Sequence, residues 1–316
     1  MELLSFSRLV SGVLMSLCLS GCSVESTEGR FPDLDASGSI DMGGDVSIVD
    51  GQAGSALSNA SGTWALLSED RLCIFAEVGD PVENLIWSTY LVTIEDGASG
   101  TALLRQTVKL CGQRLSPLPF GFLTIVPEAL TRALSTYDFV GFLANRDAGS
   151  AYVTEAFVDL WGAEDVAYED EMPVSAEDPR VIDQDGDGEP GVTLPVTTAD
   201  GLPICQVRVV QRTRIQLEGQ IRGANLIEGE FQSDANKVVL SASSDLCASG
   251  DVGGSQGPSR FMLVRVSGDQ ALVNGDEDGD GEIDCSDLMR ARSRIAASYG
   301  FEVADPESSN CMAMGN

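Results

Sequence analysis

The fold class of this chain is indicated by residues 85–110, LIWSTYLVTIEDGASGTALLRQTVKL. Residues 85–94 are rich in β-branched and aromatic side chains, and the turn Glu95-Asp96-Gly97 follows them. Within residues 102–110 one side carries Ala102, Leu104, Val108 and Leu110, and the other carries Arg105, Thr107 and Lys109, with Gln106 as the exception. Two such segments joined by a glycine-bearing turn predict an antiparallel β-hairpin, whose second strand is half buried.

The same period of two recurs on both sides of this hairpin. Further strands are predicted at 71–78, 205–209, 213–217, 226–232, 238–242 and 261–266. Residues 127–134 and 288–299 carry helical patterns instead. We therefore predict a mainly β fold, an antiparallel barrel or sandwich of one or two units, with a short C-terminal acidic loop plus helix.

The domain organisation follows from shifts in composition along the chain. The expected parts are a signal peptide at 1–21, a disordered tether at 22–61, a first β unit at 62–162, an acidic connector at 163–182, a second β unit with an acidic loop at 183–270, and an EF-hand-like loop with a helix at 271–316. A single barrel or sandwich that includes both β units is the alternative.

The N-terminus carries the pattern of an exported protein. Arg8 precedes an apolar or small run, which ends in Leu19-Ser20-Gly21-Cys22. These four residues resemble the lipobox of bacterial lipoproteins. The resemblance implies cleavage before Cys22, a lipid on its sulfur, and Ser23 as a signal for the outer membrane. We expect an outer membrane lipoprotein, on the periplasmic face or the cell surface. Its partner is the membrane, which it would bind through this N-terminal lipid anchor.

Composition excludes several classes of function. The chain has 49 acidic and 19 basic residues among 316, a formal charge of −30, and Lys109 and Lys237 are its only lysines. Such a surface is a poor partner for nucleic acid, which binds clustered lysine and arginine. Histidine is absent, which excludes Ser-His-Asp catalysis and zinc sites with imidazole ligands.

Cysteine usage also fits an exported protein. Cys73, Cys111, Cys205, Cys247, Cys285 and Cys311 remain once the signal peptide and the lipidated cysteine are set aside. An even number in an exported chain predicts disulfides. Although other pairings are possible, we favour bonds between neighbours in sequence, 73 with 111, 205 with 247 and 285 with 311.

The most informative motif is the acidic loop at residues 276–287. Its calcium-type positions are Asp276, Asp278 and Asp280 at 1, 3 and 5, Gly281 at 6, the carbonyl of Glu282 at 7, Asp284 at 9 through water, and Asp287 at 12. Ca²⁺ takes six to eight oxygen ligands at this spacing. The loop and the helix after it resemble an EF-hand and, more closely, a dockerin repeat. We predict a structural Ca²⁺ here.

A second acidic loop lies at residues 183–191. Asp183, Asp185, Asp187 and Glu189 hold the first four ligand positions, but position 12 is Leu194. We predict a second Ca²⁺ site, which needs a ligand from elsewhere. Asp178-Pro179-Arg180-Val181-Ile182 runs into this loop, and Val209-Val210-Gln211-Arg212 follows later. This phrase resembles uncharacterised secreted lipoproteins of Gram-negative bacteria, and the resemblance implies no activity.

These features favour a calcium-binding, lipid-anchored cell-envelope protein with a non-enzymatic binding or structural role, for a protein or carbohydrate ligand. No catalytic residue is assigned. One alternative is a glycosidase-like hydrolase that uses two carboxylates. Another is a small-ligand carrier, because Gly62-Thr63-Trp64 resembles the Gly-x-Trp that opens lipocalin barrels.

Overall fold

The computed structural model describes residues 56–75, 80–97, 102–118, 121–244, 247, 251–255, 257–301, 306 and 309–312, which belong to one compact unit. The expected signal peptide, Cys22 and most of the tether lie outside the described residues.

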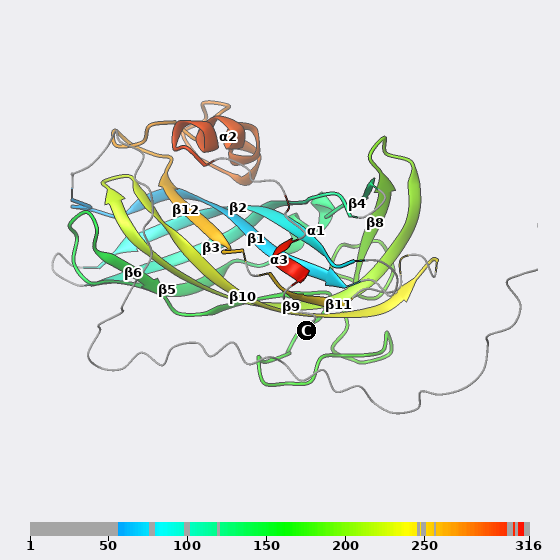
Figure 1. Ribbon diagram of the computed structural model, residues 1–316. Coiled ribbons are helices and arrows are strands. Elements are labelled where there is room, and N and C mark those ends of the chain that lie inside the picture. The colour runs from blue at the N-terminus through cyan, green and yellow to red at the C-terminus, as the bar shows by residue number, and fades with distance from the viewer. Residues whose placement is uncertain are drawn as a thin grey trace, which may run out of the picture. The chain divides into compact units, whose positions relative to one another are not determined.

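The described strands form one antiparallel sheet, shown in Figure 1. They are β1 (Gly62–Phe75), β2 (Val82–Asp96), β3 (Leu103–Leu115), β4 (Phe122–Thr124), β5 (Tyr137–Leu143), β6 (Ala151–Thr154), β7 (Phe157–Trp161), β8 (Val192–Thr198), β9 (Pro203–Gly223), β10 (Leu226–Ala242), β11 (Asp251–Gly254) and β12 (Arg260–Arg265). The mainly β prediction is confirmed, and β2 pairs with β3 as the hairpin predicts.

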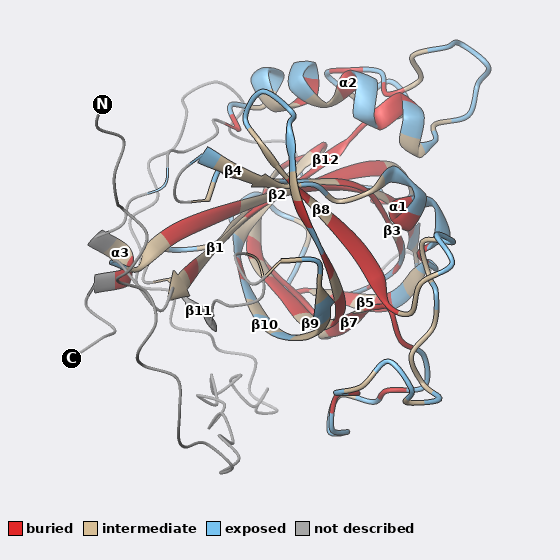
Figure 2. Ribbon diagram, turned by 90° about the vertical axis from the view of Figure 1, so that its right-hand side faces the viewer, coloured by how far each residue is buried: buried red, intermediate tan, exposed pale blue. Residues whose placement is uncertain are grey.

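The sheet closes on itself into a barrel, as Figure 2 shows. The ring runs through β1, β2, β3, β5, β6, β9, β10 and β12, and β12 returns to pair with β1. Strand β9 is long enough to pair with three strands along one edge: β8 at residues 203–209, β7 at 211–215 and β6 at 218–220. Strand β4 pairs with β8, and β11 pairs with β1. Strands from both predicted β units therefore belong to a single sheet.

Strands β9 and β10 are each continuous where the sequence predicted two shorter strands. Gly219 and Gly229 are partners in this pair. A Cβ atom on Gly229 would lie 2.4 Å from the Cα of Gly219 and 2.1 Å from the carbonyl oxygen of Glu218. Glycine at this point thus allows a close backbone approach, and the strand continues through it.

The barrel interior holds the main core, because alternate residues of each strand point inward. Trp64 is fully buried there, and its indole Nε1 donates to the carbonyl of Ala60 at 2.8 Å. The guanidinium of Arg265 lies 4.6 Å from the Trp64 ring centre. Gln106, the exception in the predicted alternation, also points inward and donates to the hydroxyl of Tyr152 at 2.7 Å.

Within the described residues three helices accompany the sheet: α1 (Glu128–Ala133), α2 (Cys285–Ser298) and α3 (Ser309–Met312). Helix α2 lies on the outer face of the barrel (Figure 2), where Leu288, Ala291 and Ile295 pack against outward-facing residues such as Ala65 and Leu67 of β1. No helix in the described part of the chain combines the length and apolar character needed to cross a membrane.

The disulfides correct two of the three favoured pairings. The bonds join Cys73 with Cys311, Cys111 with Cys285, and Cys205 with Cys247, of which only the last was expected. Strand β2 lies between β1, which carries Cys73, and β3, which carries Cys111. Two strand spacings are about 10 Å, too far for a disulfide, so each cysteine bonds to a C-terminal segment instead.

Candidate calcium loops and barrel pocket

The acidic loop at 183–191 immediately precedes β8. Oxygen atoms of Asp183, Asp185 and Asp187 all lie within 4.8 Å of one another. The Asp183 carboxylate accepts from the backbone nitrogens of Gly186 and Gly188, both at 2.9 Å. These bonds hold the turn so that three carboxylates converge on one point.

Asp185 carries the polar atom of this loop that most clearly needs a partner. Its Oδ2 accepts from the backbone nitrogen of Thr193 at 3.0 Å, whereas its buried Oδ1 makes no hydrogen bond in the described structure. Burial raises the pKa of this carboxyl, and the charges of Asp187 and Asp183 raise it further. A cation among these oxygens would satisfy the orphaned atom and remove the repulsion.

The loop at 276–287 has the same internal hydrogen bonds. Asp276 accepts from Gly279 at 2.7 Å and from Gly281 at 3.1 Å, as Asp183 does from the equivalent glycines. Oxygen atoms of Asp276, Asp278 and Asp287 lie within 4.8 Å of one another. The first aspartate thus closes both loops in the same way, although the converging carboxylates are those at positions 1, 3 and 5 in one loop and at positions 1, 3 and 12 in the other.

Asp287 is nearly inaccessible, with 2% of its surface exposed. It forms a reciprocal capping box with Asp284 at the start of α2, which explains its position. Hydrogen bonds from the Asp284 nitrogen and from Arg290 hold the pKa of Asp287 below its usual range. Arg290 contacts Asp287 at 2.6 Å and Asp278 at 3.5 Å, so it compensates part of the charge of this cluster.

Four of the assigned residues do not bring their side chains into these clusters. Asp280 and Glu282 lie outside the second group of converging carboxylates, and the Asp284 side chain caps α2 instead. The Glu189 side chain pairs with Arg208 at 3.1 Å. For Glu189 and Glu282 the assigned ligand is the backbone carbonyl, so the direction of their side chains is compatible with that role.

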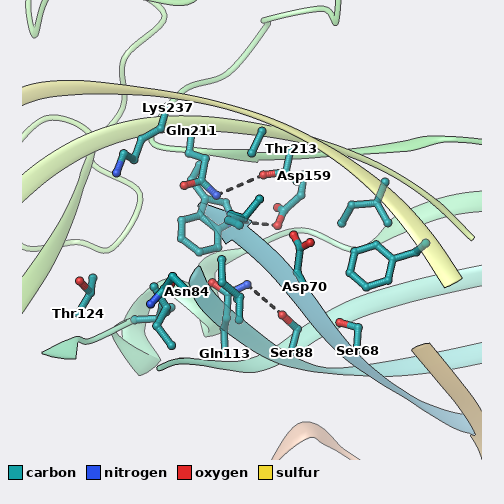
Figure 3. A pocket seen from close by; sticks show the side chains of 18 of the residues that line it. Ser68, Asp70, Asn84, Ser88, Gln113, Thr124, Asp159, Gln211, Thr213 and Lys237 are labelled. Atoms are coloured by element: carbon teal, nitrogen blue, oxygen red, sulfur yellow. Dashed lines mark hydrogen bonds between the residues drawn. The ribbon is translucent and has the colours of Figure 1, made fainter. Parts of the chain in front are cut away.

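A second site, which sequence reasoning missed, lies inside the barrel. A cavity of about 160 Å³ is lined by residues of β1, β2, β3, β7, β9 and β10, several of which Figure 3 labels. Two carboxylates, Asp70 from β1 and Asp159 from β7, project into it. The rings of Tyr90, Phe157 and Trp161 also line the cavity, and we call them its aromatic wall.

Asp159 is buried and is held by two neutral donors. The Tyr137 hydroxyl donates to Oδ1 at 2.5 Å, and the Trp161 indole donates to Oδ2 at 3.0 Å. Burial raises the pKa of Asp159 to about 6, because the two hydrogen bonds replace only part of the lost hydration. This carboxylate is therefore costly to keep ionised.

Asp70 is also held by neutral groups. Its carboxylate accepts from the hydroxyls of Ser259 at 2.7 Å and Ser233 at 2.8 Å, and from the Arg71 backbone nitrogen at 2.9 Å. Burial raises its pKa. Among the ion pairs of the described residues, none involves Asp70 or Asp159. One signal could have revealed Asp159, namely an acid at an inward position between Phe157 and Trp161.

Asp159 should make stability depend on pH, and Asp159→Asn should remove that dependence. Because the folded pKa is raised, the native state binds the proton more tightly than the unfolded chain, and stability falls as pH rises from about 4 through about 6. The full difference is about 3 kcal/mol, of which roughly 1 kcal/mol falls between pH 5 and 8. The titratable groups facing Asp159 are Tyr137, Tyr90 and Asp70.

Urea unfolding of both proteins between pH 5 and 8 tests this, in a range above the isoelectric point of about 4.1. The difference in unfolding free energy, wild type minus variant, should decrease as pH rises. A difference that stays constant with pH would show that Asp159 titrates alike in the folded and unfolded chains.

Comparison with protein-family profiles, curated proteins and solved structures found no match to this chain.

Proposed function

We propose that this chain is an exported calcium-binding lipoprotein of the cell envelope, with a binding rather than a catalytic role. The lipobox at Cys22 supports the anchor, and three disulfides are what an oxidising compartment permits. The observation that carries the calcium proposal is the shared arrangement of two separate loops, each with three converging carboxylates.

The donor sets fit Ca²⁺ because every candidate ligand is oxygen. Asp183, Asp185, Asp187 and the Glu189 carbonyl would hold one ion, and Asp276, Asp278, Asp280, the Glu282 carbonyl and Asp287 the other, with Asp284 acting through water. Bound Ca²⁺ would supply positive charge that offsets carboxylate repulsion. Its role would be structural, since one loop leads into β8 and the other into α2.

Adding 1 mM Ca²⁺ to the EDTA-treated protein should raise its melting temperature. For a dissociation constant of roughly 10 μM, each site would add about 2.7 kcal/mol of stability. Asp183→Asn and Asp276→Asn should each reduce the rise. Asp269→Asn is the matched control, because it makes the same change at an exposed position outside both loops.

Thermal unfolding followed by circular dichroism measures this effect, and calorimetry measures binding directly. An unchanged melting temperature together with no heat of binding would refute the calcium proposal. An equal effect of 1 mM Mg²⁺ would refute selectivity for Ca²⁺.

The barrel pocket supports a second candidate function, a small-ligand carrier. Eight-stranded up-and-down barrels, which include the lipocalins, have room for one small ligand, and the ring of this barrel follows that plan. Trp64 of the Gly-x-Trp motif is buried at the start of β1. Fold alone does not establish function, so the cavity beside Asp70 and Asp159 is what favours this candidate.

The glycosidase-like hydrolase would need the same two carboxylates. A cavity of about 160 Å³ is close to one that holds benzene, whereas a glycosidase must accommodate sugar on both sides of the bond that it cleaves. We therefore favour binding without turnover. Hydrolysis of nitrophenyl glycosides by wild type but not by Asp70→Asn or Asp159→Asn would overturn this choice.

A further inference from the structure

We infer that the barrel pocket binds a small organic cation, with its ammonium group beside Asp70 and Asp159 and its apolar part against the aromatic wall. This inference rests on the small-ligand carrier proposed above and names the chemical class of its ligand.

The charge balance of the pocket is the first reason. Asp70 and Asp159 are both held by neutral hydroxyl, indole or amide donors. Both carboxylates act on Tyr90, whose pKa is raised by burial, then by the charge of Asp159 and further by that of Asp70. The negative charges of a buried and a half-buried carboxylate thus share a region of low polarity, where a cation gains most from binding.

The basic side chain that lines the pocket lies away from the two carboxylates. Lys237 is the basic residue among those that line the pocket, and its side chain is exposed at the rim. Figure 3 shows Lys237 at one end of the pocket, while Asp70 and Asp159 lie together away from it. A ligand ammonium would therefore supply the positive charge that the described pocket residues do not place beside these acids.

The carboxylates also retain unused hydrogen-bonding capacity. A carboxylate offers about four acceptor positions, two on each oxygen. Each Asp159 oxygen accepts one hydrogen bond, from Tyr137 or Trp161. Asp70 Oδ1 already accepts from Ser259, Ser233 and the Arg71 nitrogen, whereas its Oδ2 accepts only from Ser233 among the described residues. One position on each Asp159 oxygen and one on Asp70 Oδ2 are thus available to an N–H donor in the cavity.

The remaining wall suits the apolar part of such a ligand. Tyr90, Phe157 and Trp161 present aromatic surface to the cavity, and Leu217 and Phe231 add apolar surface. The faces of aromatic rings attract cations, most strongly in Trp, and the attraction is larger when the cation is desolvated. The volume, about 160 Å³, admits a single six-membered ring with a short substituent, because a cavity of about 150 Å³ binds benzene.

Three probes of one shape and different charge test the inference: benzylamine as the cation, benzyl alcohol as the neutral analogue and benzoate as the anion. Calorimetry or ligand-observed NMR at pH 7.5 with the purified protein measures each affinity. Benzylamine should bind at least about tenfold more tightly than benzyl alcohol, because a charged hydrogen bond contributes more than a neutral one. Benzoate should not bind.

Two variants locate the site. Asp70→Asn and Asp159→Asn should each weaken benzylamine binding about fivefold or more, and should weaken benzyl alcohol binding by a smaller factor, because a neutral hydroxyl gains less from a carboxylate. Asp269→Asn makes the same change outside the pocket and should affect neither probe. The wild-type comparison of the three probes stands even if a variant fails to fold.

The outcomes separate the two proposals. Benzyl alcohol binding as tightly as benzylamine would overturn the cation inference and leave the carrier in place. Tighter binding of benzoate would also overturn it. Binding of none of the probes would reject both the cation inference and the carrier.

Discussion

Glu69→Gln should lower the free energy of unfolding by about 2 to 3 kcal/mol, because it removes a fully buried charged acceptor of hydrogen bonds from three side chains. Glu69 is inaccessible on the outer face of β1. It accepts from Arg71 at 3.0 Å, from Arg260 at 3.2 Å and from the Trp87 indole at 3.1 Å. A glutamine amide would present N–H donors to other donors, although Arg71 would keep its second ion pair, with Glu83 at 3.2 Å.

Urea unfolding at pH 7 with saturating Ca²⁺ measures this loss. Glu128→Gln is the matched control, because Glu128 is 82% exposed and lies 4.0 Å from Arg132. That change should cost less than about 0.5 kcal/mol. If Glu69→Gln costs no more than Glu128→Gln, the buried network does not contribute to stability.

The fold class could be predicted from the sequence because it depends on local periodicity. From Leu104 to Leu110 the alternation assigned the apolar residues to the buried face, and Gln106 lies on that face too. Ala102 was assigned to the same face, but it is exposed and precedes the strand. The burial of Gln106 requires the hydroxyl of Tyr152, which lies on another strand of the barrel. Patterning therefore indicated which residues point inward, but the polar partner that makes an inward polar residue stable comes from distant sequence.

Strand order could not be predicted in the same way, and the disulfides show why. Pairing Cys73 with Cys111 assumed that cysteines close in sequence lie together, but an intervening strand separates them. Cys205 and Cys247 were paired correctly, and β9, which carries Cys205, pairs directly with β10. Sequence proximity predicted the bond beside a direct strand pairing and failed for Cys73 with Cys111, where a strand intervenes. It also failed for Cys285 with Cys311, because each of these residues bonds to the sheet instead.

The two kinds of candidate site differ in the same way, because one depends on local sequence and the other on contacts between distant residues. Each acidic loop is contained in about a dozen residues, so its converging carboxylates follow from local spacing. The pocket joins Asp70 on β1 to Asp159 on β7, strands that meet only through closure of the sheet. No local pattern links these two residues, so the pocket emerges only from the barrel.

Cys111→Ser with Cys285→Ser should lower the free energy of unfolding by about 5 kcal/mol in the chain-entropy account. The bond spans 174 residues, so its loss greatly increases the freedom of the unfolded chain. It also fixes the start of α2 to β3, one residue after Asp284 of the acidic loop. The double variant should therefore bind Ca²⁺ more weakly, because ion binding must then order a loop that the disulfide had held in place.

Cys205→Ser with Cys247→Ser is the control, since this bond spans only 42 residues and lies outside both acidic loops. Its removal should cost about 4 kcal/mol without changing the Ca²⁺ affinity of the loop at 276–287. Urea unfolding and calcium calorimetry on both double variants separate the two effects. Equal Ca²⁺ affinities would mean that packing of α2 on the barrel positions the loop without the disulfide, because Leu288, Ala291 and Ile295 remain buried there.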